Sequence, residues 1–133
     1  MPWDIVFVRT AAGSVPAVEF LDSCSTAIEA KFDAVLTAVA AGPPHSFSGG
    51  GMWEAMHGSM GGYFEVRVNG PRREHFRLFC LLDRNGPGLP GPAVVVVDGR
   101  RKDFRTTISD SEYAAVREVG DGYLASAPRS IAT

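Results

Sequence analysis

Basic and proton-exchanging side chains recur within residues 63–105, in segments that strands would hold rigidly. Arg67 lies in one strand-like segment, His75 and Arg77 begin another, and the cluster Arg100–Lys102 follows an apolar run. Arginine binds phosphate through a planar fork of permanently charged donors, and histidine exchanges a proton near neutral pH. These residue types predict a site that holds a phosphate group and stabilises the charge that develops on it during transfer.

Alternation along the chain predicts that these side chains share one face of a sheet. Because every second residue of 63–68 and of 75–82 is apolar, Arg67 falls on the opposite face of the first segment, and His75 and Arg77 on that of the second. The turn residues between the two segments predict an antiparallel hairpin. A loop over 70–74 would set Arg67 opposite Arg77, a like-charge pair that a bound phosphate would neutralise. A register shifted by two residues is the alternative.

The surrounding elements are predicted from periodicity and capping signals. Residues 4–8 form a buried strand, and the β-branched run 94–97 is typical of a central strand covered on both faces. Helices are expected after Ser14, from a capping box at Thr26–Glu29, and from a second box at Ser109–Glu112.

Three segments are expected to lack regular structure. Residues 45–62 are rich in glycine and serine, although Trp53 should pack within the fold, and 85–92 contains three glycines and three prolines. The tail 126–133 is expected to fray. We therefore predict one α+β domain over residues 1–133. In it, an N-terminal strand and a helical hairpin pack on a small, mainly antiparallel twisted sheet with a C-terminal helix.

Composition is that of an ordinary globular protein, with 45% apolar and 21% charged residues. The net charge of −2 argues against a polyanion partner, but the charges are unevenly placed. Residues 1–65 carry two cations, whereas residues 66–105 carry nine. This asymmetry keeps nucleic acid among the candidate partners.

Neither the cysteines nor the N-terminus indicates a metal, a cofactor or a membrane. Cys24 and Cys80 match no metal-ligand spacing and are expected to be reduced thiols. The first residues lack a signal-peptide pattern, and no apolar run approaches the roughly 20 residues of a membrane helix. We expect a cytoplasmic protein that needs no metal or other cofactor.

Four short motifs follow one another along the chain. They are Val18–Asp22 with its Phe-Leu pair, Phe64–Arg67, Phe76–Phe79, and the run Val94–Lys102 followed by Thr107 and the capping box Ser109–Glu112. In this order they resemble the RelE/HigB-like toxins of type II toxin–antitoxin systems, in particular the phage-derived HigB-like branch of the RelE/ParE superfamily. That family usually has an aromatic residue where Arg100 stands and a lysine where Asp103 stands.

The resemblance implies a ribosome-dependent endoribonuclease that cuts mRNA, inhibits translation and arrests growth. A base would take the proton of a ribose 2′-OH, which attacks the adjacent phosphate without a metal. Arg67 and Arg77 match the strand arginines of the family, and Arg101 and Lys102 match its basic cluster. With His75 added for its own chemistry, the candidate catalytic residues are Arg67, Arg77, His75 and Lys102. The candidate RNA-binding residues are Arg72, Arg73, Arg100, Arg101 and Arg105. The implied partners are a cognate antitoxin of the helix-turn-helix kind, the ribosome and mRNA, and a homodimer is left open.

The sequence alone does not identify the residue that acts as the general base. His75 shares a strand face with Arg77, but a histidine at the start of a strand is more often an ordinary surface residue. His45 and His57 lie in the glycine-rich loop. Many relatives use a tyrosine or histidine near the C-terminus, and the tyrosines in this region, Tyr113 and Tyr123, fall within the predicted helix, while Phe104 occupies the nearer position.

Other readings of the same residues remain. A surface ion pair with Glu65 would explain Arg67, and a solvated turn would explain Arg72 and Arg73. For the whole chain, the alternatives are a ParE-like toxin that acts on DNA gyrase and a non-catalytic RNA-binding or regulatory domain on the same fold.

Overall fold

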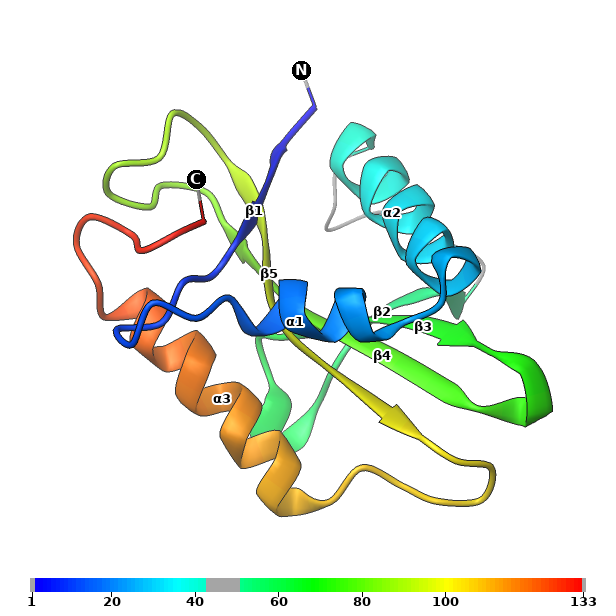
Figure 1. Cartoon of the computed structure of the whole chain (residues 1–133). Coiled ribbons are helices and arrows are strands. Elements are labelled where there is room, and N and C mark those ends of the chain that lie inside the picture. Colours follow the sequence, from blue (N-terminus) through cyan, green and yellow to red (C-terminus); the bar gives the residue numbers. More distant parts are fainter. Residues whose placement is uncertain (1, 43–50, 133) are drawn as a thin grey trace.

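The computed structural model describes residues 2–42 and 51–132. Within these residues the chain forms strands, α-helices and short 3₁₀ helices (Figure 1). In order they are β1 (Asp4–Phe7), α1 (Pro16–Ser23), α2 (Thr26–Ala41), β2 (Trp53–Ala55), η3 (Gly58–Met60), β3 (Phe64–Asn69), η4 (Pro71–Arg73), β4 (His75–Asp83), β5 (Ala93–Lys102) and α3 (Asp110–Leu124).

The strands form one sheet in the order β1-β5-β4-β3-β2. β1 runs parallel to β5, and the other neighbouring pairs are antiparallel. β5 lies inside the sheet, and its run Val94–Val97 is fully buried, as its unbroken β-branched sequence predicts. The predicted α+β fold, with a mainly antiparallel sheet, an N-terminal strand, a helical pair and a C-terminal helix, is confirmed.

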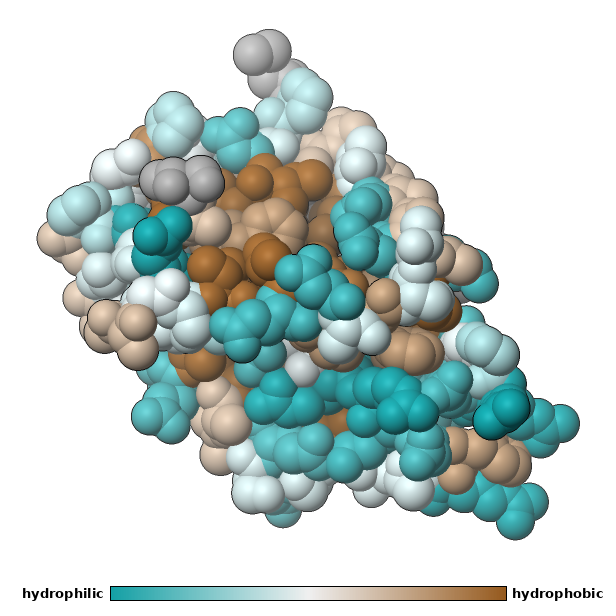
Figure 2. All heavy atoms as spheres, viewed as in Figure 1, coloured by the Kyte–Doolittle hydropathy of each residue, from teal (hydrophilic) through white to brown (hydrophobic). Residues whose placement is uncertain are grey.

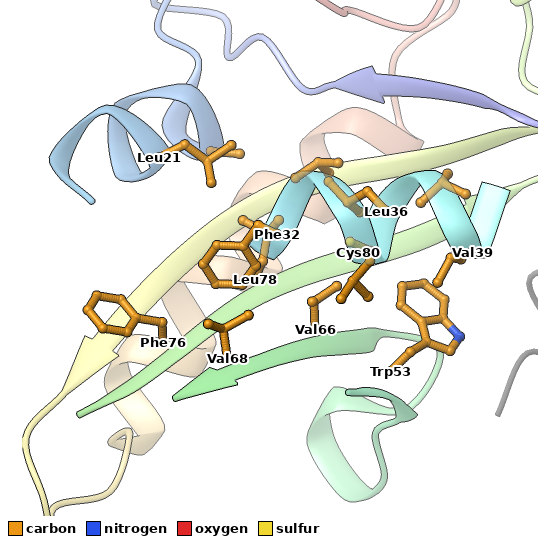
Figure 3. Close-up of a cluster of buried hydrophobic side chains, with 14 of the residues drawn as sticks. Leu21, Phe32, Leu36, Val39, Trp53, Val66, Val68, Phe76, Leu78 and Cys80 are labelled. Carbon is orange, nitrogen blue, oxygen red and sulfur yellow. The ribbon is translucent and has the colours of Figure 1, made fainter. Parts of the chain in front are cut away.

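Helices α1 and α2 seal one face of the sheet. The buried residues of α2, among them Phe32, Leu36 and Val39, recur at helical spacing and pack on alternate residues of β3 and β4 (Figure 3). On β4 the covered residues run from Phe76 to Cys80 without a polar interruption. Each such side chain contributes about 1.5–3 kcal/mol when removed from water, so this face supplies a large part of the stability.

Helix α3 covers only part of the opposite face. Phe79 of β4 and Val95 of β5 are buried in a second apolar cluster with Val116 and Tyr123 of α3. His75, nearer the start of β4 on the same face, is only partly buried. In the view of Figure 2, hydrophilic residues gather over the β3–β4 turn and the loop that follows β5.

Two glycines allow elements to approach closely. A Cβ atom at Gly99 would overlap the ring of Phe20, so α1 rests directly on β5 at that position. A Cβ atom at Gly120 would overlap the hydroxyl of Tyr63, so α3 sits against the start of the β3 hairpin. Both positions therefore require a residue without a side chain.

The helix starts were predicted with mixed success. Ser25 caps α2 by accepting a hydrogen bond from the Ile28 N–H at 3.2 Å, so the predicted capping box at Thr26–Glu29 is wrong by one residue. The box at Ser109–Glu112 is confirmed, since the Ser109 hydroxyl accepts from the Glu112 N–H and the Glu112 carboxylate accepts from the Ser109 N–H. Ser14 caps nothing, because α1 begins at Pro16.

Part of the segment 45–62 is regular although none of it was predicted to be. Residues 45–50, with His45, lie outside the described residues. Trp53 begins β2, is 3% exposed, and stacks on Phe64 with the ring centroids 4.8 Å apart. A strand of three residues is too short to show a period of two, which is why composition alone suggested a loop.

The prediction of a frayed tail is wrong for residues 126–132. Ile131 forms an isolated bridge with Val8, the residue after β1, and Arg129 lies 3.0 Å from the carboxylate of Asp83. The same carboxylate accepts a hydrogen bond from Tyr123 at 2.7 Å. These partners are distant in sequence, so no pattern of neighbouring residues predicts the contacts between them.

Candidate active site

A cavity of about 320 Å³ lies where the uncovered end of the sheet meets the start of α3. It is lined by residues of β3, β4, β5, α3 and the loop between the last two, namely Glu65, Arg67, His75, Arg77, Lys102, Thr106, Thr107, Ile108 and Tyr113. The predicted catalytic residues Arg67, His75, Arg77 and Lys102 are all among them. Strand pairing brings them together, because His75 lies opposite Lys102 and Arg67 opposite Arg77.

Three arginines form a row across neighbouring strands. Arg67 of β3 pairs with Arg77 of β4, and Arg77 pairs with Arg100 of β5. The predicted register of the hairpin is therefore confirmed, and the register shifted by two residues is not adopted. Like charges at directly paired positions repel one another, so the row requires anionic partners.

The outer arginines of the row have carboxylate partners, and the central one does not. Arg67 lies 3.3 Å from Glu54, and Arg100 lies 2.9 Å from Asp98. Within residues 2–42 and 51–132, no carboxylate reaches salt-bridge distance of Arg77. Arg67 also lies 3.5 Å from Glu65, which is the ion pair that the sequence offered as the alternative explanation for Arg67. Arg77 is not explained in this way.

Arg77 is held in place by neutral groups. Its guanidinium donates to the backbone carbonyl of Phe76 at 2.9 Å and contacts His75 Nδ1 at 3.4 Å. Burial lowers the pKa of Arg77, and the nearby charge of Arg67 lowers it further, while Glu65 opposes both effects. A partly buried guanidinium without a counter-ion beside a cavity is a suitable position for an anion.

His75 can expose a proton-accepting nitrogen to the cavity. Its Nδ1 lies 3.3 Å from Asn69 Oδ1 and 3.4 Å from the Arg77 guanidinium. The contact with Asn69 favours the tautomer with the proton on Nδ1, which leaves Nε2 as the acceptor. The contact with Arg77 favours the opposite tautomer, in which Nε2 carries the proton. An anion that moves the Arg77 guanidinium away from the imidazole would therefore favour the tautomer in which Nε2 can accept a proton.

Tyr113 and Glu65 also line the cavity, and the sequence did not single them out for it. Tyr113 packs edge-on against Phe79 with ring centroids 5.9 Å apart. Burial raises the pKa of Tyr113, the charge of Glu65 raises it further, and Arg77 opposes them. One signal was available: Tyr113 precedes Val116 by three residues, so it begins the buried stripe of α3 and points toward the sheet.

Lys102 is anchored by the helix that it faces. Its Nζ lies 2.6 Å from the Glu112 carboxylate, which also closes the capping box with Ser109. The hydrogen bond from Lys102 lowers the pKa of Glu112, and the bonds from Ser109 act in the same direction. Glu112 therefore joins the start of α3 to the end of β5 and fixes the width of the cavity.

The predicted RNA-binding arginines separate into three environments. Arg100 lies 2.9 Å from Asp98 and 3.7 Å from Glu112. Arg101 pairs with Phe76 across the strands, so alternation puts it on the face away from the cavity, where it binds Glu74. Neither lines the cavity. The remaining three lie at loop tips, and they are Arg72, Arg73 and Arg105.

The loop-tip arginines gather around an exposed aromatic ring. The guanidinium carbon of Arg73 lies 4.9 Å from the centroid of Phe104, and that of Arg105 lies 5.2 Å from it. Both loops lie at the end of the sheet where β4 begins, since His75 pairs with Lys102 there (Figure 1). We call Arg73, Phe104 and Arg105 the loop-tip stack.

These arginines also have strained backbones. Arg72, Arg73 and Arg105 have φ values of 59°, 61° and 67°, in the left-handed region. That conformation costs roughly 1–2 kcal/mol for a residue with a Cβ atom, whereas a cation–π contact at an exposed ring returns about 0.5–1 kcal/mol. The contacts of the stack therefore do not account for arginine at these positions.

A second cavity, of about 660 Å³, lies on the other side of α3. The loop from Arg9 to Ala12, the end of α3 around Gly122, and Ser130 of the tail contribute to its lining. Asp98 also reaches it from β5. None of the residues predicted to be functional lines this cavity.

Comparison with known protein families, curated proteins and solved structures finds no match to this chain. Within residues 2–42 and 51–132, no three histidine, cysteine or acidic side chains are grouped so as to hold a metal ion. No helix in these ranges combines the length and the apolar character needed to span a bilayer.

Proposed function

We propose that this chain is a toxin of the RelE/HigB-like kind, a ribosome-dependent and metal-independent endoribonuclease that cuts mRNA. The observation that carries the proposal is the environment of Arg77. It lacks a carboxylate partner among the described residues, lies between two further arginines, and lines a cavity with His75 and Tyr113. The motif resemblance supplies the substrate class, and the geometry offers a place for a phosphate group.

In the proposed reaction the ribose 2′-oxygen attacks phosphorus, and the bond from phosphorus to the 5′-oxygen breaks. His75 takes the proton of the 2′-OH, and Tyr113 donates a proton to the leaving 5′-oxygen. Burial raises the pKa of Tyr113, which keeps the hydroxyl protonated but makes it a weaker acid, whereas the charge of Arg77 opposes this shift and favours donation of the proton. The products are a 2′,3′-cyclic phosphate and a free 5′-hydroxyl.

Arg77 and Arg67 would bind the phosphoryl oxygens, where negative charge grows as the new bond forms. A phosphate between them would replace the repulsion of the paired arginines by attraction to both. Lys102, held by Glu112, would contact an adjacent phosphate of the same strand. In this scheme Arg100 and Arg101 support the site without touching the scissile phosphate.

A toxin of this kind acts in the cytoplasm and requires a neutralising partner. We propose that a small helix-turn-helix antitoxin, encoded beside this chain, covers the cavity and its basic rim with an acidic segment. The ribosome and mRNA would then be its targets when the antitoxin is lost.

The test is cleavage of a defined mRNA by the purified chain, with and without translating ribosomes. We expect cuts that depend on ribosomes and leave 2′,3′-cyclic phosphate ends. Arg77→Ala should lower the cleavage rate at least about 100-fold, because it removes a donor aimed at the developing charge. Lys31→Ala is the control, because it removes an exposed cation of α2 outside the cavity, and it should stay within about 3-fold of the wild type.

Intact mRNA during growth arrest would reject the ribonuclease. Arrest accompanied by DNA damage would indicate the ParE-like alternative, an inhibitor of DNA gyrase. A chain that binds RNA without cutting it, and that does not arrest growth, would be the non-catalytic RNA-binding domain.

A further inference from the structure

The loop-tip stack has no part in the reaction at Arg77, yet it borders the same cavity. Phe104 is 42% exposed and is the aromatic residue among the large apolar side chains exposed by the described part of the chain. Arg73 and Arg105 both place their guanidinium groups over its ring. The exposed ring and the two guanidinium groups therefore form a group of planar surfaces that carries positive charge.

The two carboxylates adjacent to the stack in sequence are paired with a third arginine rather than with Arg73 or Arg105. Glu74 follows Arg73, and Asp103 precedes Phe104, and Arg101 forms ion pairs with both of these acids. No salt bridge to Arg73 or Arg105 occurs within the described residues. The positive charge of the stack is therefore available to an external anion.

The loop-tip stack and the lining of the cavity are separated by two residues along each of the two loops. His75 follows Arg73 by two residues, and Thr106 follows Phe104 by two; both His75 and Thr106 line the cavity. Two residues span at most about 7 Å. Arg77 lies four residues after Arg73, at most about 14 Å along the chain, so an RNA strand with one phosphate at Arg77 would reach the stack within its next few nucleotides.

We propose that the loop-tip stack is a binding site for one unpaired base of single-stranded RNA, near the phosphate held at Arg77. Unpaired bases stack on aromatic rings and on guanidinium planes, and every base has such a face. The site would therefore accept any base but exclude a base that is paired within a duplex. The inference deepens the proposed function and rests on its assignment of RNA as the ligand.

The left-handed backbone of Arg73 and Arg105 fits this role. Glycine or asparagine would occupy such positions with less strain, but neither offers a planar cation for the ring and for phosphates on either side of the base. Strained residues of this kind gather at ligand-binding sites because the bound contact requires their geometry.

The experiment measures binding of a short 2′-O-methyl RNA, in which the 2′-oxygen cannot attack, by fluorescence anisotropy at several salt concentrations. The second probe is the same strand with abasic positions, and the third is its duplex. Phe104→Leu should weaken binding of the intact single strand about 5- to 100-fold. It should leave binding of the abasic strand and of the duplex unchanged, while Phe104→Trp should retain tight binding.

Arg73→Gln should reduce the slope of log affinity against log salt by about one, whereas Phe104→Leu should not alter that slope. Equal loss on the intact and abasic strands, or no loss on either, would overturn the base site, as would a wild-type chain that binds no single strand at low salt. Thermal unfolding of each variant shows that the fold is retained. Binding that depends on the base, without cleavage of mRNA, would support the base-binding site and reject the ribonuclease activity. Cleavage at an unchanged rate in Phe104→Leu would support the ribonuclease activity and reject the base-binding site.

Discussion

The two faces of β4 differ in how far helices cover them. On the side of α1 and α2, alternate side chains from Phe76 to Cys80 are buried throughout. On the side of α3 the environment changes half way along, because Arg77 lines a cavity whereas Phe79 is completely buried. The same backbone thus carries a closed face that supplies stability and an open half-face that supplies chemistry.

This arrangement explains how the arginines on the open half-face keep fixed positions although no apolar side chains surround them. Arg67 and Arg77 are set by strand pairing, and the strands are held from behind by Val66 and Leu78. A rigid backbone with a sealed rear face positions side chains more accurately than a loop would. The difference between the faces can be tested by substitutions on each.

The largest effect is expected on the closed face. Leu78→Ala removes a fully buried side chain that is packed beneath α2, and should lower the free energy of unfolding by about 2–5 kcal/mol. Urea denaturation followed by circular dichroism measures this change. Leu78→Ile preserves volume and should cost less than about 1.5 kcal/mol; an equal loss in both variants would mean that the position depends on shape alone.

An intermediate effect is expected where α3 meets the open half-face. Glu112→Gln keeps an amide able to close the capping box but removes the charge that pairs with Lys102. An exposed pair of this kind contributes up to about 1 kcal/mol near neutral pH, so the variant should be less stable by a similar amount.

The pH dependence of this difference follows from the lowered pKa of Glu112. A carboxylate whose pKa is lower in the folded state stabilises the protein at pH values above its pKa in the unfolded chain, which is 4.5 for a free glutamate side chain. That contribution disappears as the pH falls through the folded value. The gap between wild type and Glu112→Gln should therefore close in acid, and a gap that persists well below pH 4 would contradict the ion pair as its cause.

The smallest effect on stability is expected at Arg77. Arg77→Gln removes a charge that repels Arg67 and that no carboxylate in the described residues neutralises. Its free energy of unfolding should stay within about 0.5 kcal/mol of the wild type, measured by the same urea denaturation. A loss above about 2 kcal/mol would assign Arg77 to the fold and remove the basis for placing a phosphate there.

Much of the site was predictable because it depends on local rules. The turn at 70–74 sets the hairpin register, and the period of two then fixes which side chains share a face. These rules sufficed to place Arg67 opposite Arg77 and to group His75 with them. The capping box at Ser109 likewise needs only contacts three residues apart.

What the sequence could not determine depends on contacts between distant segments. Tyr113 reaches the cavity because α3 returns across the sheet, and Arg101 faces away because a bulge between Phe79 and Cys80 shifts its strand against β4. Charge pairing was predictable only within one strand, as for Arg67 with Glu65, whereas Glu54 and Glu112 come from other elements.

The amino-acid sequence by itself therefore determined the strands other than β2, the faces of the hairpin and the candidate cations. Tertiary structure alone decided which of those cations are neutralised and which remain available, with Arg77 in the cavity and the loop-tip stack beside it. The physical reason is that periodicity acts over a few residues along one chain segment, whereas an ion pair depends on the distance between side chains that different elements bring together.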